Sequence, residues 1–395
     1  MRRISTIMIA AAWAVQAAPV SAEDVIRAAV LRVDQVNLPP ISRLDAMPDD
    51  LGFAGAELAT QDNATTGQFM GQDFETETIA TDEDGATDAL EQILASGTRF
   101  VAVVADDATM LQLADHAAQV APEALLFNAA SGGDHLRNED CRANVIHIAP
   151  SRAMLTDALA QFLIWKRWDR WFLIHGSHEG DHALRDAYIR AAGKFNARIV
   201  ETREFEDTGG SRRTDSGHVQ VQAQLPVFTQ NVRDHHVTVT ADENGVFAAY
   251  MPYQTWDARP VAGSAGLGPR AFHPALEAWG ATQFQNRFER LANRPIRDVD
   301  YNVWLSLRAL GEAATRAGST DPEALRDYIT GPEFQIAGFK GEALSLRDWD
   351  HQLRQPILLA TPHLVASVSP QEGFLHQVSQ LDTLGTDRAE STCQF

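Results

Sequence analysis

Basic residues are scarce in this chain of 395 residues. Lysine and arginine total 33, against 53 aspartates and glutamates, and the formal net charge is −20. A nucleic-acid-binding surface gathers lysine and arginine against phosphates. We therefore do not expect this anionic chain to bind nucleic acid. An anionic ligand would have to be held by a local group of arginines that overcomes the repulsion of the chain's net negative charge.

Long apolar runs are also absent from the sequence after the N-terminal segment. A membrane-spanning helix would need ~20 consecutive apolar residues. The first 22 residues carry the three parts of a secretory signal. These are Arg2 and Arg3, a short apolar run over 7–20, and the small residues Val20-Ser21-Ala22. We predict a cleaved signal peptide at 1–22 and a periplasmic mature protein; the run is short for a transmembrane anchor.

Cysteine occurs only twice, as Cys141 and Cys393. In an oxidising compartment this count is compatible with one disulfide, and we predict that the two residues pair. Spacing alone does not establish that they meet. Two buried free thiols are the alternative.

Motifs of the common enzyme classes are missing too. The sequence contains no Walker loop, no G-x-S-x-G and no G-x-G-x-x-G at a strand-to-helix junction. We therefore expect a protein that is not an enzyme, with no catalytic residue, no resident metal and no cofactor.

What is present is an alternation of apolar, β-branched runs with helical patterns. Residues 26–33 and 100–105 predict buried strands, and Asp107 is predicted to cap a helix that runs to about residue 120. The alternation resumes after residue 150, with strands predicted at 171–175 and 236–241. Alternating strands and helices predict parallel sheets covered by helices.

We therefore predict an α/β fold of two doubly wound parallel-sheet lobes joined by a hinge. The first lobe is expected to hold 23–150 plus about 271–338, and the second 151–270 plus about 339–395. Ligands of open α/β sheets bind outside the carboxyl ends of the strands. We expect a ligand in a cleft between the lobes, near the loops that follow residues 105, 129, 175 and 250.

Three segments, in the order of the predicted elements, resemble branched-chain amino acid binding proteins. Residues 52–63 resemble their first helix, 148–154 their crossover into the second lobe, and 275–291, with Trp279 and Phe288, their late helix near the hinge. The resemblance to these type 1 periplasmic binding proteins implies a solute-binding protein of an ABC uptake system. It also implies an ABC permease in the inner membrane as partner.

Four further segments resemble a narrower subgroup, the binding proteins associated with dehydrogenase systems that depend on pyrroloquinoline quinone (PQQ). They are residues 62–72, 253–267, 339–341 and 347–356. This resemblance implies that PQQ is bound as a ligand in the interlobe cleft, with a quinoprotein dehydrogenase as a second potential partner. The alternative is the same fold binding a branched-chain amino acid or an amide.

A PQQ site needs arginines for three carboxylates and an aromatic wall for a flat tricyclic ring. Trp256 and Arg259 supply one of each, in the loop expected after a strand that ends near Tyr250. The alternative is that Trp256 packs between the lobes and Arg259 pairs with a surface acid. Arg354 is a further candidate ligand contact, or else part of a structural clamp near the hinge with Arg347.

Other candidate ligand contacts follow predicted strands. Asn128 and Ser131 lie in a small, polar strand-end loop that would let backbone N–H groups approach a carboxylate. A second group, in the loop after residue 175, is Ser177, His178 and Asp181. Tyr301, at the start of the helix predicted at 299–316, is the last candidate, although an aromatic stripe on a helix is more often core.

One motif favours a different class of protein. His178-Glu179-Gly180-Asp181-His182 matches H-E-x-x-H, a pattern of zinc hydrolases. That mechanism needs both histidines on one helical face, whereas this segment is predicted as a strand-to-helix loop with a glycine at its centre. We predict that it is not a hydrolytic centre. A third ligand from Glu201, Glu204 or Glu206 would need the fold to bring it there, and adventitious metal binding by His175, His178 and His182 stays open.

Overall fold

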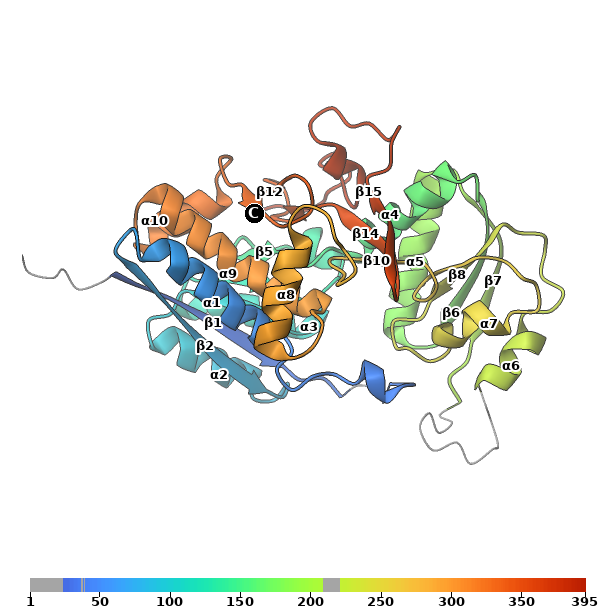
Figure 1. Ribbon diagram of the computed structural model, residues 1–395, viewed down its shortest axis with the longest axis horizontal. Helices are drawn as coiled ribbons and strands as arrows, with labels where there is room; N and C mark the ends of the chain where they lie inside the picture. Colours follow the sequence, from blue (N-terminus) through green and yellow to red (C-terminus); the bar gives the residue numbers. More distant parts are fainter. Residues whose placement is uncertain (1–23, 37, 39, 209–220) are drawn as a thin grey trace, which may run out of the picture.

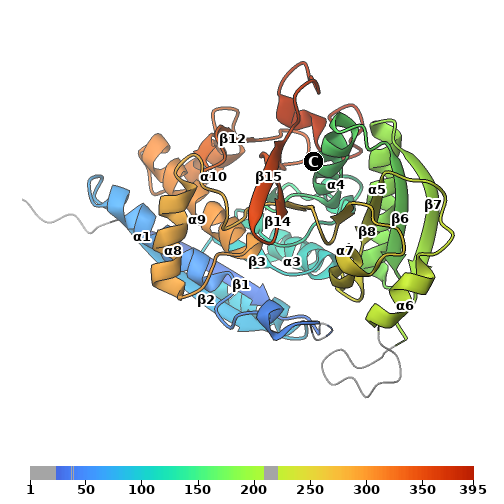
Figure 2. The same cartoon turned by 45° about the vertical axis from the view of Figure 1, so that its right-hand side comes forward.

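The computed structural model describes residues 24–36, 38, 40–208 and 221–395 (Figure 1). The predicted signal peptide lies outside the described residues. The described chain forms two lobes side by side, each built on a parallel sheet, and a small antiparallel sheet lies between them (Figures 1 and 2). The predicted α/β fold with two parallel-sheet lobes is confirmed.

The first lobe has a five-stranded parallel sheet. Its strand order is β2 (Gln72–Thr81), β1 (Asp24–Val33), β3 (Phe100–Val104), β4 (Leu125–Asn128) and β5 (Val145–His147). Alternate side chains of one strand point to opposite faces. Val30 packs in the core under α1 (Phe53–Gly67) and α9 (Asp298–Ala317), whereas Leu31 packs in the core under α2 (Ala86–Ala95) and α3 (Asp107–Val120). Both faces of the sheet are therefore buried, as the continuous apolar runs predict.

The second lobe repeats this plan with four parallel strands. Their order is β7 (Arg198–Phe205), β6 (Arg170–Gly176), β8 (Val237–Ala241) and β9 (Val261–Gly263). Leu173 of β6 packs with α4 (Arg152–Trp165) and α5 (Glu179–Lys194). Phe172 and Ile174 of the same strand pack with α6 (Val221–Phe228) and with Met251 of α7 (Met251–Gln254).

The antiparallel sheet between the lobes contains β10 (Gly268–Arg270), β14 (Ile357–Thr361) and β15 (Leu364–Ser369). The alternation along β14 divides its side chains between two cores. Ile357 and Leu359 pack in the core of the second lobe, and Leu358 packs in the core of the first. This strand thus ties the two lobes together.

The last part of the chain differs from the sequence-based assignment of 339–395 to the second lobe. The strands β11 (Ile336–Ala337), β12 (Ala343–Leu346) and β13 (Leu353–Arg354) form a small antiparallel sheet. Leu344 and Leu353 of this sheet pack in the core of the first lobe. The chain therefore passes between the lobes at β14, which begins at Ile357 rather than near residue 339 as expected from the sequence.

Several shorter helices complete the described chain. They are η1 (Arg43–Asp45), η2 (His135–Arg137), η3 (Ala248–Tyr250), α8 (Ala281–Ala292), α10 (Pro322–Thr330) and η4 (Gln380–Thr383). The prediction of a strand ending near Tyr250 is wrong, because β8 ends at Ala241 and η3 and α7 follow it. Pro252 lies in the first turn of α7, where its missing N–H costs no hydrogen bond.

Cys141 and Cys393 form a disulfide, with their Cα atoms 5.6 Å apart. The bond joins the loop after η2 in the first lobe to the end of the chain. The cysteine pair expected from the sequence is therefore present in the structure.

Candidate functional site

A pocket of about 440 Å³ lies between the two lobes. The first lobe lines it with the loop after β4 and the start of α9, and the second with α5 and the loops after β8 and β9. The lining residues used below are Arg152, Tyr188, Asp242, Glu243, Arg270, Asp298 and Asn302. The carboxyl ends of parallel strands thus meet here, where open α/β sheets bind ligands.

A glycine lets two strand ends of the second lobe approach each other beside this pocket. Gly263 ends β9 with φ +105°, a conformation that side-chain-bearing residues rarely adopt. A Cβ atom there would lie 2.3 Å from the carbonyl oxygen of Thr240 on the neighbouring strand. Only glycine lets the two strand ends approach so closely.

Arg152, at the start of α4, joins the two lobes on one side of the pocket. Its guanidinium donates to Asp107 of the first lobe at 2.8 Å and to both oxygens of Glu243 of the second lobe at 2.8 and 2.6 Å. Burial favours a lower pKa for Arg152, but Glu243 and Asp107 outweigh it and raise the pKa. Burial likewise opposes ionisation of Asp107, yet Arg152 and Ser131 hold the pKa of that carboxyl below its ordinary value. Arg152 is thus fully engaged with protein groups.

Arg270 differs from Arg152 because its guanidinium forms no hydrogen bond or ion pair with the residues that the structure describes. It is exposed in the pocket, at the end of β10. Tyr188 of α5 lies close enough to interact with it electrostatically: burial raises the pKa of the tyrosine hydroxyl, and Arg270 opposes that rise. The pocket therefore presents a free cationic fork beside a phenol.

Asn302 of α9 offers the complementary polarity. Its amide nitrogen donates to the carbonyl oxygen of Ala129 at 2.9 Å, while its Oδ1 is buried without a partner among the described residues. A buried acceptor of this kind is costly unless something donates to it. The Oδ1 atom is thus available to a donor group of a ligand.

Two carboxylates in the pocket are already occupied by backbone donors. Asp242 accepts from the N–H groups of Val246, Phe247 and Ala248 at 2.6 to 2.7 Å, and burial nevertheless raises its pKa. Asp298 accepts from the N–H of Phe272 at 2.8 Å. Their charges limit how many anionic groups a ligand can bring into the pocket.

Trp256 and Arg259, predicted to contact the ligand, do not line this pocket. The Trp256 side chain is 60% exposed, and Arg259 forms an ion pair with Asp234 at 3.1 Å. These two residues lie away from the pocket because they follow α7, whose Met251 is held in the core beside α6. Arg259 thus pairs with a surface acid, which was the alternative to a ligand contact.

The predicted strand-end loop after β4 does reach the pocket, through its backbone positions Ala130 and Gly132. The side chains of Asn128 and Ser131 point elsewhere. Asn128 donates to the carbonyl oxygen of Ser131 and accepts from its N–H, both at 2.9 Å, and the Ser131 hydroxyl donates to Asp107 at 2.5 Å. These two side chains shape the loop rather than line the pocket.

The loop after β6 is likewise held by internal bonds. The Ser177 hydroxyl accepts from the N–H of Asp207, and His178 Nε2 lies 2.9 Å from a carboxylate oxygen of the same residue. Asp181 is fully buried and accepts from the N–H groups of His178 and Asn244. None of the three predicted contacts lines the pocket.

Tyr301 and Arg354 also lie away from the pocket. The Tyr301 hydroxyl donates to the carbonyl oxygen of Gly338 at 2.7 Å, and its ring stacks on Phe272 in the first core. Arg354 donates to the buried carboxylate of Asp382 at 2.8 and 3.0 Å. These contacts fit the structural alternatives considered for the two residues, in which Tyr301 belongs to the core and Arg354 to a clamp near the hinge.

The residues that sequence reasoning missed are Arg270, Tyr188 and Asn302. Tyr188 and Asn302 lie in the middle of helices, where an aromatic or amide residue gives no functional signal. Arg270 carried a weak signal, because it closely follows a predicted strand. Only the meeting of the two lobes brings them together.

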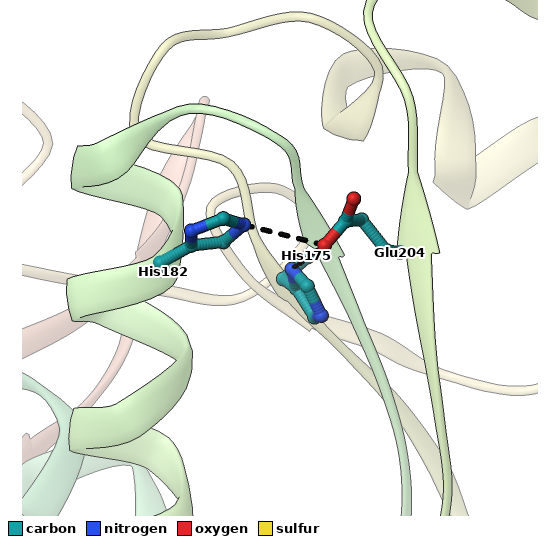
Figure 3. A group of neighbouring side chains, drawn as sticks. All are labelled: His175, His182 and Glu204. Carbon is teal, nitrogen blue, oxygen red and sulfur yellow. Dashed lines mark hydrogen bonds and ion pairs between the residues drawn. The ribbon is translucent and has the colours of Figure 1, made fainter.

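The H-E-x-x-H segment does not place its two histidines at a common site. His178 precedes α5 and pairs with Asp207, whereas His182 lies in the first turn of the helix beside His175 and Glu204 (Figure 3). The hydrolase arrangement of both motif histidines on one metal is therefore not formed.

No helix within the described part of the chain combines the length and apolar character needed to cross a bilayer. The model of the family described as "periplasmic binding protein" matches residues 48–363. No match was found among curated proteins.

Solved structures share the fold at low sequence identity. A periplasmic binding protein from Burkholderia mallei is 14% identical, with a TM-score of 0.65 over 94% of this chain and 98% of that chain. A branched-chain amino acid ABC transporter ligand-binding protein from Burkholderia xenovorans is also 14% identical, with a TM-score of 0.68 over 88% and 92%. An ABC transporter solute-binding protein from R. palustris, solved in complex with benzoate, is 11% identical, with a TM-score of 0.66 over 94% and 99%. With its family match over most of the sequence and its two-lobed fold, this chain belongs to the periplasmic binding protein family.

Proposed function

We propose that this protein is the receptor of an ABC uptake system and that its lobes close by hinge motion on a small solute carrying a carboxylate. The observation that carries the proposal is Arg270, a guanidinium in the interlobe pocket without a partner among the described residues. A planar guanidinium matches a carboxylate through two parallel hydrogen bonds. The negative charge of the whole chain makes such a free local cation the natural anchor for an anion.

The solute would meet both lobes at once. Arg270, in the sheet between the lobes, and Tyr188 of the second lobe would hold its carboxylate, and Asn302 of the first lobe would accept a hydrogen bond from a donor group. A ligand that bonds to both lobes stabilises the closed conformation by its difference in affinity for the two states. The pocket volume of about 440 Å³ lies in the range of small-molecule sites.

The specific cargo suggested by the sequence resemblance is PQQ, which would bind here as a ligand. In its favour, Arg270 suits one of the three carboxylates, and Gly263 and Ser264 of the resembling segment 253–267 line the pocket. Against it, Arg152 is already paired, and Tyr188 is the single aromatic ring among the lining residues. A quinoprotein dehydrogenase as partner belongs to this version of the proposal alone.

An amino acid is the second candidate, and a specific observation favours it. Asn302 and Asp298 both line the pocket, and Asn302 Oδ1 and the Asp298 oxygen that does not accept from Phe272 could receive an ammonium group while Arg270 holds the carboxylate. One cationic and one acceptor end match a zwitterion better than a tricarboxylate.

Calorimetric titration of the purified protein with PQQ, leucine and benzoate tests the proposal. We expect one of these carboxylates to bind with a stoichiometry of one. Arg270→Ala should weaken that binding by ~2–5 kcal/mol, and Arg270→Lys should recover only part of the loss, because an ammonium cannot form the fork. Arg259→Ala is the matched control, since it removes an arginine that does not line the pocket, and it should leave the affinity unchanged.

Two results would count against this assignment. If Arg270→Ala binds the carboxylate as tightly as the wild type, the solute lies elsewhere. If PQQ gives no heat while leucine does, the PQQ version fails and the receptor proposal stands.

A further inference from the structure

Three potential metal ligands converge in the second lobe, apart from the residues that line the interlobe pocket. They are His175 at the end of β6, His182 in the first turn of α5 and Glu204 on β7 (Figure 3). One ligand atom of each lies within 4.8 Å of the ligand atoms of the other two. We propose that these three side chains bind a divalent transition-metal ion of the Zn²⁺ class.

The secondary structure explains why the three meet. His175 and Glu204 are direct register partners on neighbouring parallel strands, so their side chains leave the sheet on the same face. The loop after β6 then turns into α5, and its first turn brings His182 over that face. The imidazole of His182 meets the ring of His175 edge-on, with the ring centroids 5.4 Å apart.

The distances are close to those of a tetrahedral zinc site. With metal–ligand bonds of 2.0–2.2 Å, two ligand atoms at a tetrahedral angle are about 3.3–3.6 Å apart. His182 Nε2 lies 3.3 Å and His175 Nδ1 lies 3.8 Å from the same carboxylate oxygen of Glu204. Both distances to Glu204 are thus within about 0.5 Å of a tetrahedral arrangement, and the two histidine ligand atoms lie within 4.8 Å of each other.

The chemistry of the ligands selects the class of metal. Two imidazoles with one carboxylate suit zinc, copper or nickel, whereas calcium and magnesium require oxygen ligands. His175 Nδ1 lies 2.7 Å from the carbonyl oxygen of Gly176, to which it donates. When that proton moves to Nε2, the lone pair of Nδ1 becomes available to the ion.

The surrounding charges also favour a cation. The carboxylate of Asp186 interacts with His182 and His175, and the nearby Arg185 is paired with Asp186 at 2.7 Å. The charges of Asp186 and Arg185 offset each other, so the carboxylate of Glu204 supplies the negative charge that complements a divalent ion. His175 is buried while Glu204 is exposed, so the site is both fixed on one side and open to solvent on the other.

This site differs from the one that the H-E-x-x-H motif would form. It uses the second histidine of the motif, omits the first, and takes its other ligands from two strands. It replaces our expectation from the sequence that no metal is bound. It is independent of the proposed carboxylate site, because none of its three ligands lines the interlobe pocket.

Zinc calorimetry on protein purified without a polyhistidine tag tests the proposal, using ZnCl₂ as titrant and MgCl₂ and CaCl₂ as comparison salts. We expect one Zn²⁺ per chain and no heat from the other two cations. His182→Gln and Glu204→Gln each remove one of the three ligands and should weaken zinc binding at least about tenfold. His178→Gln is the matched control, since His178 is the other motif histidine and is also paired with a carboxylate; zinc binding should stay within about twofold.

A second readout guards against a variant that folds poorly. Circular dichroism of each variant without metal should match the wild type, and the rise in melting temperature on adding zinc should be lost in His182→Gln and Glu204→Gln but kept in His178→Gln. The proposal is overturned if the wild type takes up no zinc at about 100 μM. It is equally overturned if folded His182→Gln binds zinc as the wild type does, or if loss of His178 abolishes binding.

Discussion

Asp382 is the centre of a buried charge cluster near the hinge, and removing its charge gives a sharp test of how the C-terminal segment is held. Its carboxylate accepts from Arg347 at 3.0 Å and from Arg354 at 2.8 and 3.0 Å. The side chains of Asp382 and Arg347 are each 1% exposed. Arg347 also donates to the carbonyl oxygens of Leu381 and Leu384, so the cluster fixes the turn around η4.

Asp382→Asn keeps the shape but leaves two guanidinium groups facing a neutral amide. Breaking a buried ion pair on one side costs about 3–5 kcal/mol, since the remaining charge is left without compensation. Asp350 lies 3.8 Å from Arg347 and compensates part of this loss, which puts our expectation near the lower end, about 3 kcal/mol. Such a loss is a large part of the usual 5–15 kcal/mol of a folded protein.

Urea unfolding followed by tryptophan fluorescence and by circular dichroism measures this change. Asp348→Asn is the matched control, because Asp348 pairs with Arg388 at the surface, where the two side chains are 66% and 62% exposed. The control should change the free energy of unfolding by less than about 0.5 kcal/mol. A loss below about 1 kcal/mol for Asp382→Asn would refute the reasoning, because the two guanidinium groups would then be satisfied without it.

Three further predictions follow from other parts of the fold. Replacing Cys141 and Cys393 by serine opens a loop with a sequence separation of 252 and should lower the free energy of unfolding in urea by up to about 5 kcal/mol. Two free thiols in an Ellman assay of the unreduced, unfolded wild-type protein would contradict the disulfide. Burial raises the pKa of Asp350 from 3.8 to about 6, so between these pH values the folded state keeps a proton that the unfolded chain has lost. The free energy of unfolding, relative to that of Asp350→Asn, should therefore fall by up to about 3 kcal/mol as pH rises from about 4 to 6, and parallel pH–stability curves for the two proteins would disprove this. Gly55→Ala places a Cβ 2.1 Å from a backbone oxygen of α9 and should lower the free energy of unfolding by at least about 1–3 kcal/mol, whereas Gly193→Ala, with no atom within 4 Å, should be neutral or stabilising. Equal melting temperatures for the two variants would show that α1 can move away from α9.

The sequence by itself determined the fold class and most of the elements that build the two lobes. Runs such as 100–105 are apolar at every position and rich in valine, which is typical of a strand buried on both faces. Helix starts carried local signals as well: Asp106 accepts from the N–H of Thr109 and caps α3, one residue before the cap expected from the sequence. These features depend on neighbours in the chain, so the chain alone reveals them.

The late strands depended on contacts that the sequence does not display. The strand β14 is short, and its side chains are divided between the two lobes, so its apolar pattern gave no sign of which lobe it joins. The helices at 248–254 were missed for the same reason, since they are held by packing against α6 rather than by a strong local pattern.

The candidate sites were decided by tertiary structure alone. Arg259 and Arg270 are both arginines near the ends of strand-like segments, yet one meets Asp234 at the surface and the other has no partner among the described residues and lines the pocket. His178 and His182 are likewise equal members of one motif, and only the first turn of α5, lying over the paired strands β6 and β7, brings His182 beside Glu204. Residue type and spacing determine what a side chain can do; which groups it meets depends on strands and helices that are far apart in the sequence and adjacent only after folding.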